Sequence, residues 1–432
     1  MVAHSSLELG KFEDAEKSYT TVLRLTAPND KTRTLVIDNL AASIYKQGEQ
    51  ANKRGDYKTA AEHFLRVATV APTSKIRPTA EYDGATALLQ LKEWNRAVDV
   101  LQRFRKNYPG NELQPEVTKK IAFALKEGGN SALAAAEYER VETETKDDEL
   151  RRGALALAAE LYEQAGQSTG ALRVYRRYVE YFPKPLELAI ETRNKIAQLY
   201  KSANDTKAYF NELRQIVDSD ARAGSERTDR TRYLAALSAL ALTEPLYQQF
   251  VEIKLVQPFK KNLARKKAAL KKTIDAFGKL PDYQVGEVTA ASAFYIAETY
   301  RYFGRALAES ERPKNLTALE REQYELALED QVYPFEEKAI SLHEKNLELL
   351  DRGVYNTWID KSIARLAKLV PARYAKFEES MDFVERIGPF RYEQVTQRSL
   401  SGAVAPKSQP LENGKAQKMN GSSQQRPNAA AR

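Results

Sequence analysis

One small residue returns at a nearly constant interval through the first half of this 432-residue chain. Gly48, Ala85, Ala122, Ala159 and Ala197 follow one another at spacings of 37, 37, 37 and 38 residues. A sequence that repeats itself with a period of about 20 to 50 residues is typical of an array in which every repeat is one supersecondary unit. This interval therefore limits the possible folds more than any other feature.

Two further positions recur in register with this ladder of small residues. A second small residue follows twelve residues later, except where Tyr209 replaces it, and a large residue follows after four more. Small residues let two helix backbones approach, and the large side chain fills the space beside that contact. The pattern predicts pairs of antiparallel helices. The second small residues are Ala60, Ala97, Ala134 and Ala171, and the large ones are Phe64, Leu101, Tyr138, Tyr175 and Leu213.

Glycine and proline mark the expected helix ends. We expect the first helix of a hairpin to end at a glycine with positive φ, and the second helix to end before a proline. The glycines are Gly10, Gly55, Gly129 and Gly166, and the prolines are Pro72, Pro109 and Pro183. One hairpin cannot bury its apolar face alone, so neighbouring hairpins should stack into a solenoid with one concave side.

These recurring positions resemble the tetratricopeptide repeat (TPR) family, over about residues 1–218. The pitch of 37 residues exceeds the usual 34 of that family and implies a longer turn between repeats. The Trp-Leu-Gly start of the family repeat is weak in this chain. The longer pitch, with Tyr-Pro endings, looks like the TPR proteins of bacterial outer-membrane assembly and Tol-Pal systems. The resemblance implies an all-α solenoid that binds other proteins.

The chain is predicted to have three regions. Residues 1–218 form the solenoid, residues 219–395 an irregular helical-repeat region, and residues 396–432 a polar, basic and disordered tail, too polar to offset the entropy of ordering. The first repeat is incomplete, because its template places Ala3 at the first small position. We therefore expect that the chain is a shortened form of a longer array.

The second region is expected to return to the hairpin pattern. Within residues 292–300, Ile296, Ala297 and Tyr300 repeat the spacing that residues 196–200 show. Gly304 then stands at the position of Asn204, where a first helix ends. We predict a separate helix over residues 316–331 and a further helix pair over residues 354–371. The segments 333–346 and 358–374 resemble proteobacterial TPR proteins assigned to the TonB system, and this resemblance implies a scaffold in the cell envelope.

Composition argues against thiol and metal chemistry. The chain has no cysteine and three histidines, which stand at positions 4, 63 and 343, so a thiolate zinc site, an iron–sulfur cluster and a disulfide framework are excluded. We expect no metal and no cofactor, and surface or boundary positions for His63 and His343. The net charge of +8 (67 − 59) includes +4 from residues 401–432, so no nucleic-acid-binding domain is predicted.

One motif and several acidic pairs are candidates for catalysis. Residues 166–170 match the pattern G-x-S-x-G, which in hydrolases requires a preceding strand and His and Asp partners. Here the motif falls on the turn between two predicted helices, so it is interpreted as a turn. Adjacent acids such as Glu336 and Glu337 point apart on a helix, which favours solvated or helix-capping roles. No catalytic residue is predicted, and the chain is not expected to be an enzyme.

Two surfaces are candidate binding sites. In the TPR family the first helix of each hairpin lines the concave groove, and mixed charged, amide and aromatic groups there suit an extended peptide or a partner helix; solvated residues without a partner are the alternative interpretation. The corresponding residues are Tyr45, Glu49, Asn52, Tyr82, Thr86, Leu89, Lys119, Phe123, Lys126, Glu160, Glu163, Asn194, Gln198 and Lys201.

The second surface is a basic helix face near residue 265. Its apolar stripe and dense charge predict an amphipathic helix that either docks on an anionic surface or is a solvated face. Its residues are Lys260, Lys261, Arg265, Lys266, Lys267, Lys271 and Lys272, and all of them except Lys266 lie on the side of the helix away from the apolar stripe.

The predicted function is a non-enzymatic TPR scaffold for protein–protein interactions in the bacterial cell envelope, associated with a TonB-type transport system. The alternatives are a cytoplasmic TPR adaptor, and an envelope enzyme or enzyme regulator. No export signal is visible at the start of the chain, so the chain as given is expected in the cytoplasm. A natural N-terminus that carries an export signal would place it in the periplasm.

Overall fold

A computed structural model describes residues 1–314 and 316–375 of the chain. Within these ranges it contains eighteen α-helices, three short 3-10 helices and no strand, so the predicted all-α class is confirmed. The predicted tail, residues 396–432, lies outside the described residues. The helices are α1 (Val2–Glu8), α2 (Phe12–Leu25), α3 (Arg33–Lys53), α4 (Tyr57–Val70), α5 (Arg77–Gln90), α6 (Trp94–Asn107), α7 (Gln114–Glu127), α8 (Ser131–Glu144), α9 (Asp148–Gln164), α10 (Ser168–Tyr181), α11 (Leu186–Ser202), α12 (Thr206–Ala221), α13 (Asp229–Glu252), α14 (Phe259–Phe277), α15 (Gly286–Ala308), α16 (Ala318–Leu347), α17 (Thr357–Leu369) and α18 (Pro371–Tyr374), with η1 (Gly224–Glu226), η2 (Leu280–Tyr283) and η3 (Leu350–Arg352).

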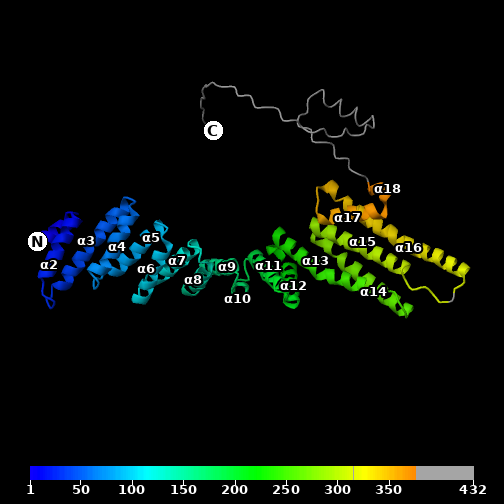
Figure 1. The fold of residues 1–432 in the computed structure, drawn as a ribbon, viewed down its shortest axis with the longest axis horizontal. Coiled ribbons are helices and arrows are strands. Elements are labelled where there is room, and N and C mark those ends of the chain that lie inside the picture. Colours follow the sequence, from blue (N-terminus) through cyan, green and yellow to red (C-terminus); the bar gives the residue numbers. More distant parts are fainter. Residues whose placement is uncertain (315, 376–432) are drawn as a thin grey trace, which may run out of the picture. The chain divides into compact units, whose positions relative to one another are not determined.

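The first twelve helices form six consecutive hairpins. Each helix packs against the next one in chain order, so that α3 pairs with α4, α5 with α6, and so on to α11 with α12 (Figure 1). The second helix of one hairpin also packs against the first helix of the following hairpin. This stacking is the predicted α-solenoid.

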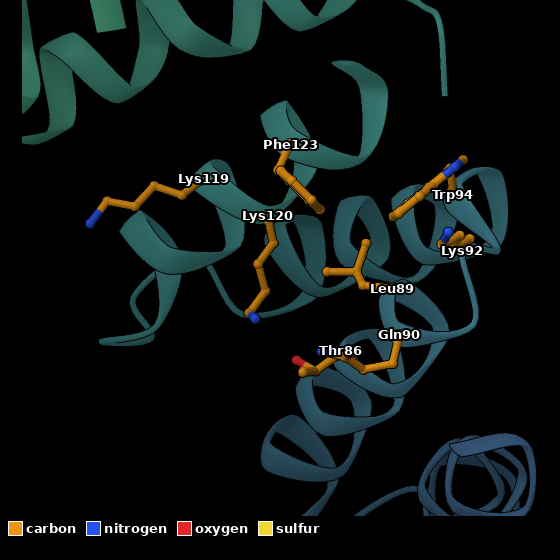
Figure 2. A pocket seen from close by; sticks show the side chains of 8 residues that line it. All are labelled: Thr86, Leu89, Gln90, Lys92, Trp94, Lys119, Lys120 and Phe123. Carbon is orange, nitrogen blue, oxygen red and sulfur yellow. The ribbon is translucent and has the colours of Figure 1, made fainter. Parts of the chain in front are cut away.

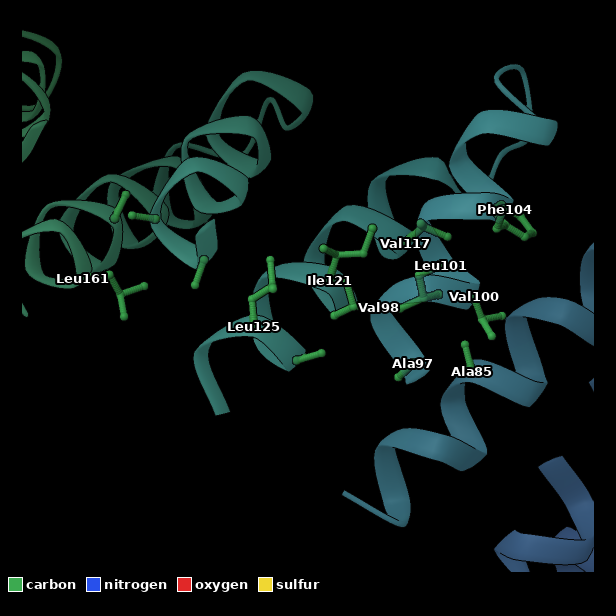
Figure 3. Packing of buried hydrophobic residues seen from close by; sticks show 14 of the residues in the cluster. Ala85, Ala97, Val98, Val100, Leu101, Phe104, Val117, Ile121, Leu125 and Leu161 are labelled. Atoms are coloured by element: carbon green, nitrogen blue, oxygen red, sulfur yellow. The ribbon is translucent and has the colours of Figure 1, made fainter. Parts of the chain in front are cut away.

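The ladder of small residues lies where these helices meet. Gly48 of α3 and the equivalent alanines of α5, α7, α9 and α11 are buried. Phe64 of α4 is buried with 3% exposure, and its ring fills the space beside Gly48. The same side chain also lies beside Gly84 of α5. Figure 3 shows the core from α5 onward, with Val98 and Leu101 of α6 beside α7. The predicted helix contacts are therefore confirmed.

The turns within the hairpins follow the expected chemistry. Gly10, Gly55, Gly129 and Gly166 have φ between 71° and 79°, and each directly follows the C-cap residue of a first helix. Hairpins without glycine at this position use a strained non-glycine residue there instead, with φ of 59° at Lys92 and 58° at Asn204. Helices α4, α6 and α10 have C-cap residues 71, 108 and 182, each followed by proline, as predicted.

The C-terminal helices differ from the expectations in three ways. Gly304 does not end a helix: it is buried within α15, because Val332 and Phe335 of α16 pack against it. The predicted separate helix over residues 316–331 is instead the first half of α16, which continues through Pro334. The predicted helix pair over residues 354–371 is one helix, α17, followed by the single turn α18.

Lys266 is not part of the exposed basic face to which it was assigned. It is 2% exposed, and its ammonium group donates to the carbonyl oxygens of Phe250 and Ile253 at 3.1 and 2.7 Å. Both carbonyls lie at the C-terminal end of α13, where helix carbonyls lack partners within the helix and the helix dipole attracts a cation. Burial lowers the pKa of Lys266 to about 8. The physical reason is that α14 turns this one lysine toward α13.

The lowered pKa of Lys266 predicts a rise in stability at alkaline pH. The unfolded chain binds more protons than the folded chain between about pH 8 and pH 10.5, so the free energy of unfolding should increase across that window, by on the order of 2–3 kcal/mol. Urea unfolding of the native chain and of Lys266→Met at several pH values tests this. The free energy of unfolding of the native chain minus that of Lys266→Met should rise across this window. Equal pH profiles of the two proteins would contradict the prediction.

His343 is completely buried, so its predicted surface or boundary position is wrong; His63 is half-buried, as predicted. The His343 ring on α16 lies 3.4 Å from the Glu298 carboxylate of α15, and its other nitrogen lies 3.2 Å from the Ser362 hydroxyl of α17. Glu298 also accepts hydrogen bonds from Arg301 at 2.9 and 3.0 Å and from Arg365 at 2.9 Å. This buried polar cluster joins α15, α16 and α17.

Candidate functional site

One pocket collects several of the predicted groove residues. It has a volume of about 500 Å³ and lies between α5 and α7, beside the start of α6. Thr86, Leu89, Lys119 and Phe123 were predicted from the repeat template, and all four line it. Gln90, Lys92, Trp94 and Lys120 complete the lining (Figure 2).

The floor of the pocket is aromatic and aliphatic. Phe123 is 43% exposed, although a phenylalanine on a helix of a folded protein is usually buried. Its ring meets the Trp94 ring edge to face, with 5.8 Å between the ring centroids. In Figure 2, Phe123 and Leu89 lie between Trp94 on one side and the two lysines of α7 on the other. An apolar side chain of a ligand would therefore find an open aromatic surface here.

Three lysines border the pocket, and Glu116 and Asp83 offset part of the positive charge of two of them. Lys120 lies 5.1 Å above the ring of Tyr82, and its partial burial lowers its pKa, an effect that Glu116 and Asp83 oppose. Lys119 pairs with Glu116 at 2.8 Å on the exposed surface of α7, and Lys92 is exposed. No acidic side chain is among the lining residues in the described part of the chain. Together with the aromatic floor, this charge suits an acidic peptide that carries an apolar side chain.

The other predicted groove residues lie on first helices as expected, but several contact neighbouring helices. Tyr45 donates from its hydroxyl to Asp83 at 2.6 Å, which joins α3 to α5. Glu160 pairs with Lys195 at 2.6 Å, which joins α9 to α11. Glu163 accepts a 2.5 Å hydrogen bond from Tyr175. The first two contacts join consecutive hairpins, and the third joins the two helices of one hairpin. Asn52, Lys126, Gln198 and Lys201 are exposed, and Glu49, Tyr82 and Asn194 are partly exposed.

The template missed four lining residues for identifiable reasons. Gln90, Lys92 and Trp94 lie at or beyond the end of a first helix, outside the positions that the template assigns to the groove. Lys120 is next to the predicted Lys119 and turns toward Tyr82. The sequence signal that could have identified Lys120 is its position next to Lys119, with Phe123 four residues after Lys119.

The remaining candidate features have simpler positions. Six of the seven residues of the basic face are exposed on α14, and Lys266 is the exception described above. The motif over residues 166–170 spans the turn and the start of α10, where no strand precedes it. In the described ranges there is no cluster of three or more residues that could ligate a metal, and no helix is both long and apolar enough to span a bilayer.

Comparisons with known families match two parts of the solenoid. The model of an outer membrane lipoprotein family, YfiO, matches residues 37–140, which include the helices that form the pocket. A tetratricopeptide repeat model matches residues 154–185, which correspond to α9 and α10. The repeat assignment therefore has support from sequence families as well as from the fold. A comparison with curated proteins finds no similar sequence.

Solved structures with similar helical arrays have little sequence in common with this chain. A TPR protein from Parabacteroides merdae is 14% identical over 76% of this chain and 98% of its own, with a TM-score of 0.29. A TPR protein from Bacteroides fragilis is 12% identical over 60% and 98%, with a TM-score of 0.30. The yeast Sti1 TPR2AB domain, in a complex with pHSP90, is 15% identical over 61% and 98%, with a TM-score of 0.24. These scores are too low to support an argument about function.

Proposed function

We propose that this chain is a non-enzymatic scaffold of the bacterial cell envelope that holds an acidic segment of a partner protein in the pocket between α5 and α7. The observation that carries the proposal is an exposed aromatic surface bordered by three lysines. Apolar contact gives affinity, and the lysines select acidic partners and accelerate their encounter. The match to an outer membrane lipoprotein family over residues 37–140 supports an envelope location.

The partner is proposed to belong to a TonB-type transport system. This narrower assignment is supported by the resemblance of residues 333–346 and 358–374 to TPR proteins of that system. An export signal at the natural N-terminus is part of the proposal. A cytoplasmic adaptor with the same groove is the second candidate, because the aromatic surface and the lysines of the pocket would bind an acidic segment in either compartment.

Crosslinking in living cells tests the pocket directly. A photo-reactive amino acid at position 123 should crosslink the partner, whereas the same amino acid at Leu133 should not, since Leu133 is 60% exposed on α8 outside the pocket. Lys119→Glu with Lys120→Glu should reduce the crosslink at least about tenfold by repelling an acidic segment. Equal crosslinking at both positions, or no loss on charge reversal, would contradict the pocket.

Identification of the crosslinked protein and cell fractionation decide among the functions. Envelope proteins that include a TonB-complex component, with the chain in the periplasmic or membrane fraction, would support the proposal. Recovery only of cytosolic proteins would favour the adaptor. A catalytic activity of the purified chain that is lost on mutation of a groove residue would favour an enzyme.

A further inference from the structure

The outer face of α16 carries a stripe of exposed apolar side chains. Leu319, Leu326 and Tyr333 are 65%, 58% and 61% exposed, and they follow one another at intervals of seven residues. Ile340 continues the interval and is partly exposed. Seven residues are close to two helical turns, so such residues lie on one side of a helix, as in the seam of a coiled coil. The stripe extends for about 32 Å at 1.5 Å per residue.

Acidic side chains border this stripe on both sides. Glu322, Glu329, Asp330, Glu336 and Glu337 each follow a stripe residue by three or four positions, which places them about 40° to 60° from it. All five are exposed, and none has an ion-pair partner within residues 1–314 and 316–375. A groove of about 610 Å³ lies along the C-terminal part of the stripe, beside Tyr333 and Ile340. The face therefore suits a helix with basic borders.

The exposed face of α14 has the complementary composition. Ala264 and Ala268 are exposed at its centre, where small side chains allow another helix to approach closely. The lysines at positions three or four residues from these alanines are Lys260, Lys261, Lys267, Lys271 and Lys272. All are exposed and have no ion-pair partner in the described part of the chain.

We propose that the α16 face of one copy of this chain binds the α14 face of a second copy. The acidic borders meet the lysines, and the large side chains of the stripe cover the two alanines. The acidic stretch of residues 322–337 and the basic stretch of residues 260–272 have similar lengths, about 23 and 18 Å. The two faces do not serve each other within one chain. Both α14 and α16 pack against α15 and they border a common pocket, but the residues that α16 presents there, such as Tyr324 and Leu328, lie on the side of the helix opposite the stripe. This inference does not depend on the pocket between α5 and α7.

Sedimentation of the full chain over a roughly hundredfold concentration range tests the proposal. The native chain should associate at about 0.05 M salt and weaken at least tenfold near 0.5 M, because salt screens exposed charges. Glu329→Lys with Asp330→Lys should abolish association, and so should Lys267→Glu with Lys271→Glu. Leu326→Ala, which leaves the charge unchanged, should weaken association about tenfold. Circular dichroism checks that each variant is folded.

Mixing the two charge-reversed variants gives the sharpest result. The α16 variant retains a native basic face and the α14 variant retains a native acidic face, so the mixture should associate although neither variant does alone. Lys17→Glu with Lys53→Glu changes the net charge as much as the α14 variant, at exposed lysines elsewhere, and should leave association unchanged. The proposal would be overturned if the native chain stayed monomeric, if the mixture failed to associate, or if the control variant lost association. Binding of the monomeric chain to anionic vesicles would assign the α14 face to a membrane instead.

Discussion

Glu298→Gln is expected to destabilise the C-terminal helices by about 3–5 kcal/mol. The carboxylate is 3% exposed and accepts hydrogen bonds from Arg301 and Arg365, with His343 3.4 Å away. The amide has no charge to compensate the two guanidinium groups, and partly buried cations without a counter-ion are costly. Urea unfolding measures the loss, and hydrogen exchange should place it in α15, α16 and α17, since distant repeats unfold semi-independently.

A matched substitution at the C-cap of the same helix isolates the effect of burial. Glu309 also pairs with an arginine, Arg305, but the two side chains are 63% and 57% exposed. Glu309→Gln should therefore change stability by less than about 0.5 kcal/mol. Losses of similar size from the two variants would contradict a special role for the buried cluster.

The same carboxylate predicts an acid-sensitive window. Burial alone would raise the pKa of Glu298, but His343, Arg301 and Arg365 outweigh burial and lower its pKa to about 2. A lowered pKa contributes stability that is present above the unfolded-state value near 4.5 and is lost as the pH falls toward 2. The stability difference between the native chain and Glu298→Gln should shrink across that window.

Gly48→Val is expected to cost about 2–3 kcal/mol, because a Cβ atom at this position would lie 2.7 Å from the Phe64 ring. The ring is buried between α3 and α5 and has little room to move. Hydrogen exchange should show the loss in the hairpins around α3, α4 and α5, and urea unfolding should show an earlier transition.

Gly153→Val is the control for this prediction. Gly153 lies within α9, and a Cβ atom there would meet no atom within 4 Å. Valine has a higher helix propensity than glycine, so this variant should be unchanged or up to about 0.5 kcal/mol more stable. If both variants had the same effect, helix propensity rather than the close helix contact would explain the ladder of small residues.

The repeat pattern predicted the solenoid because it is local and periodic. Each small residue and each large residue of the ladder acts on a neighbour within the same or the next hairpin, so a fixed spacing was enough to place Phe64 beside Gly48. The template also placed four pocket residues, since positions on the exposed side of a first helix follow from helical geometry. It missed Trp94, because that ring enters the pocket from the start of α6.

The second half could not be predicted in the same way, because long-range contacts determine it. Pro334 ends a predicted helix by local rules, yet α16 continues through it while packed along α15. Helical geometry places Lys266 beside the apolar stripe of α14, but its contact with the end of α13 appears only in the fold. His343 has no sequence signal of burial, and its partners come from helices 45 residues before it and 19 residues after it.

The sequence by itself therefore determined the all-α class, the pitch of the hairpins, the turns and the contacts between neighbouring helices, because these depend on residues close together in the chain. The tertiary structure alone decided which polar groups form the buried cluster, which carbonyl groups Lys266 contacts, and which side chains meet in one pocket. Those outcomes depend on the direction in which each helix presents its side chains to elements far away in the sequence, and no local pattern encodes that direction.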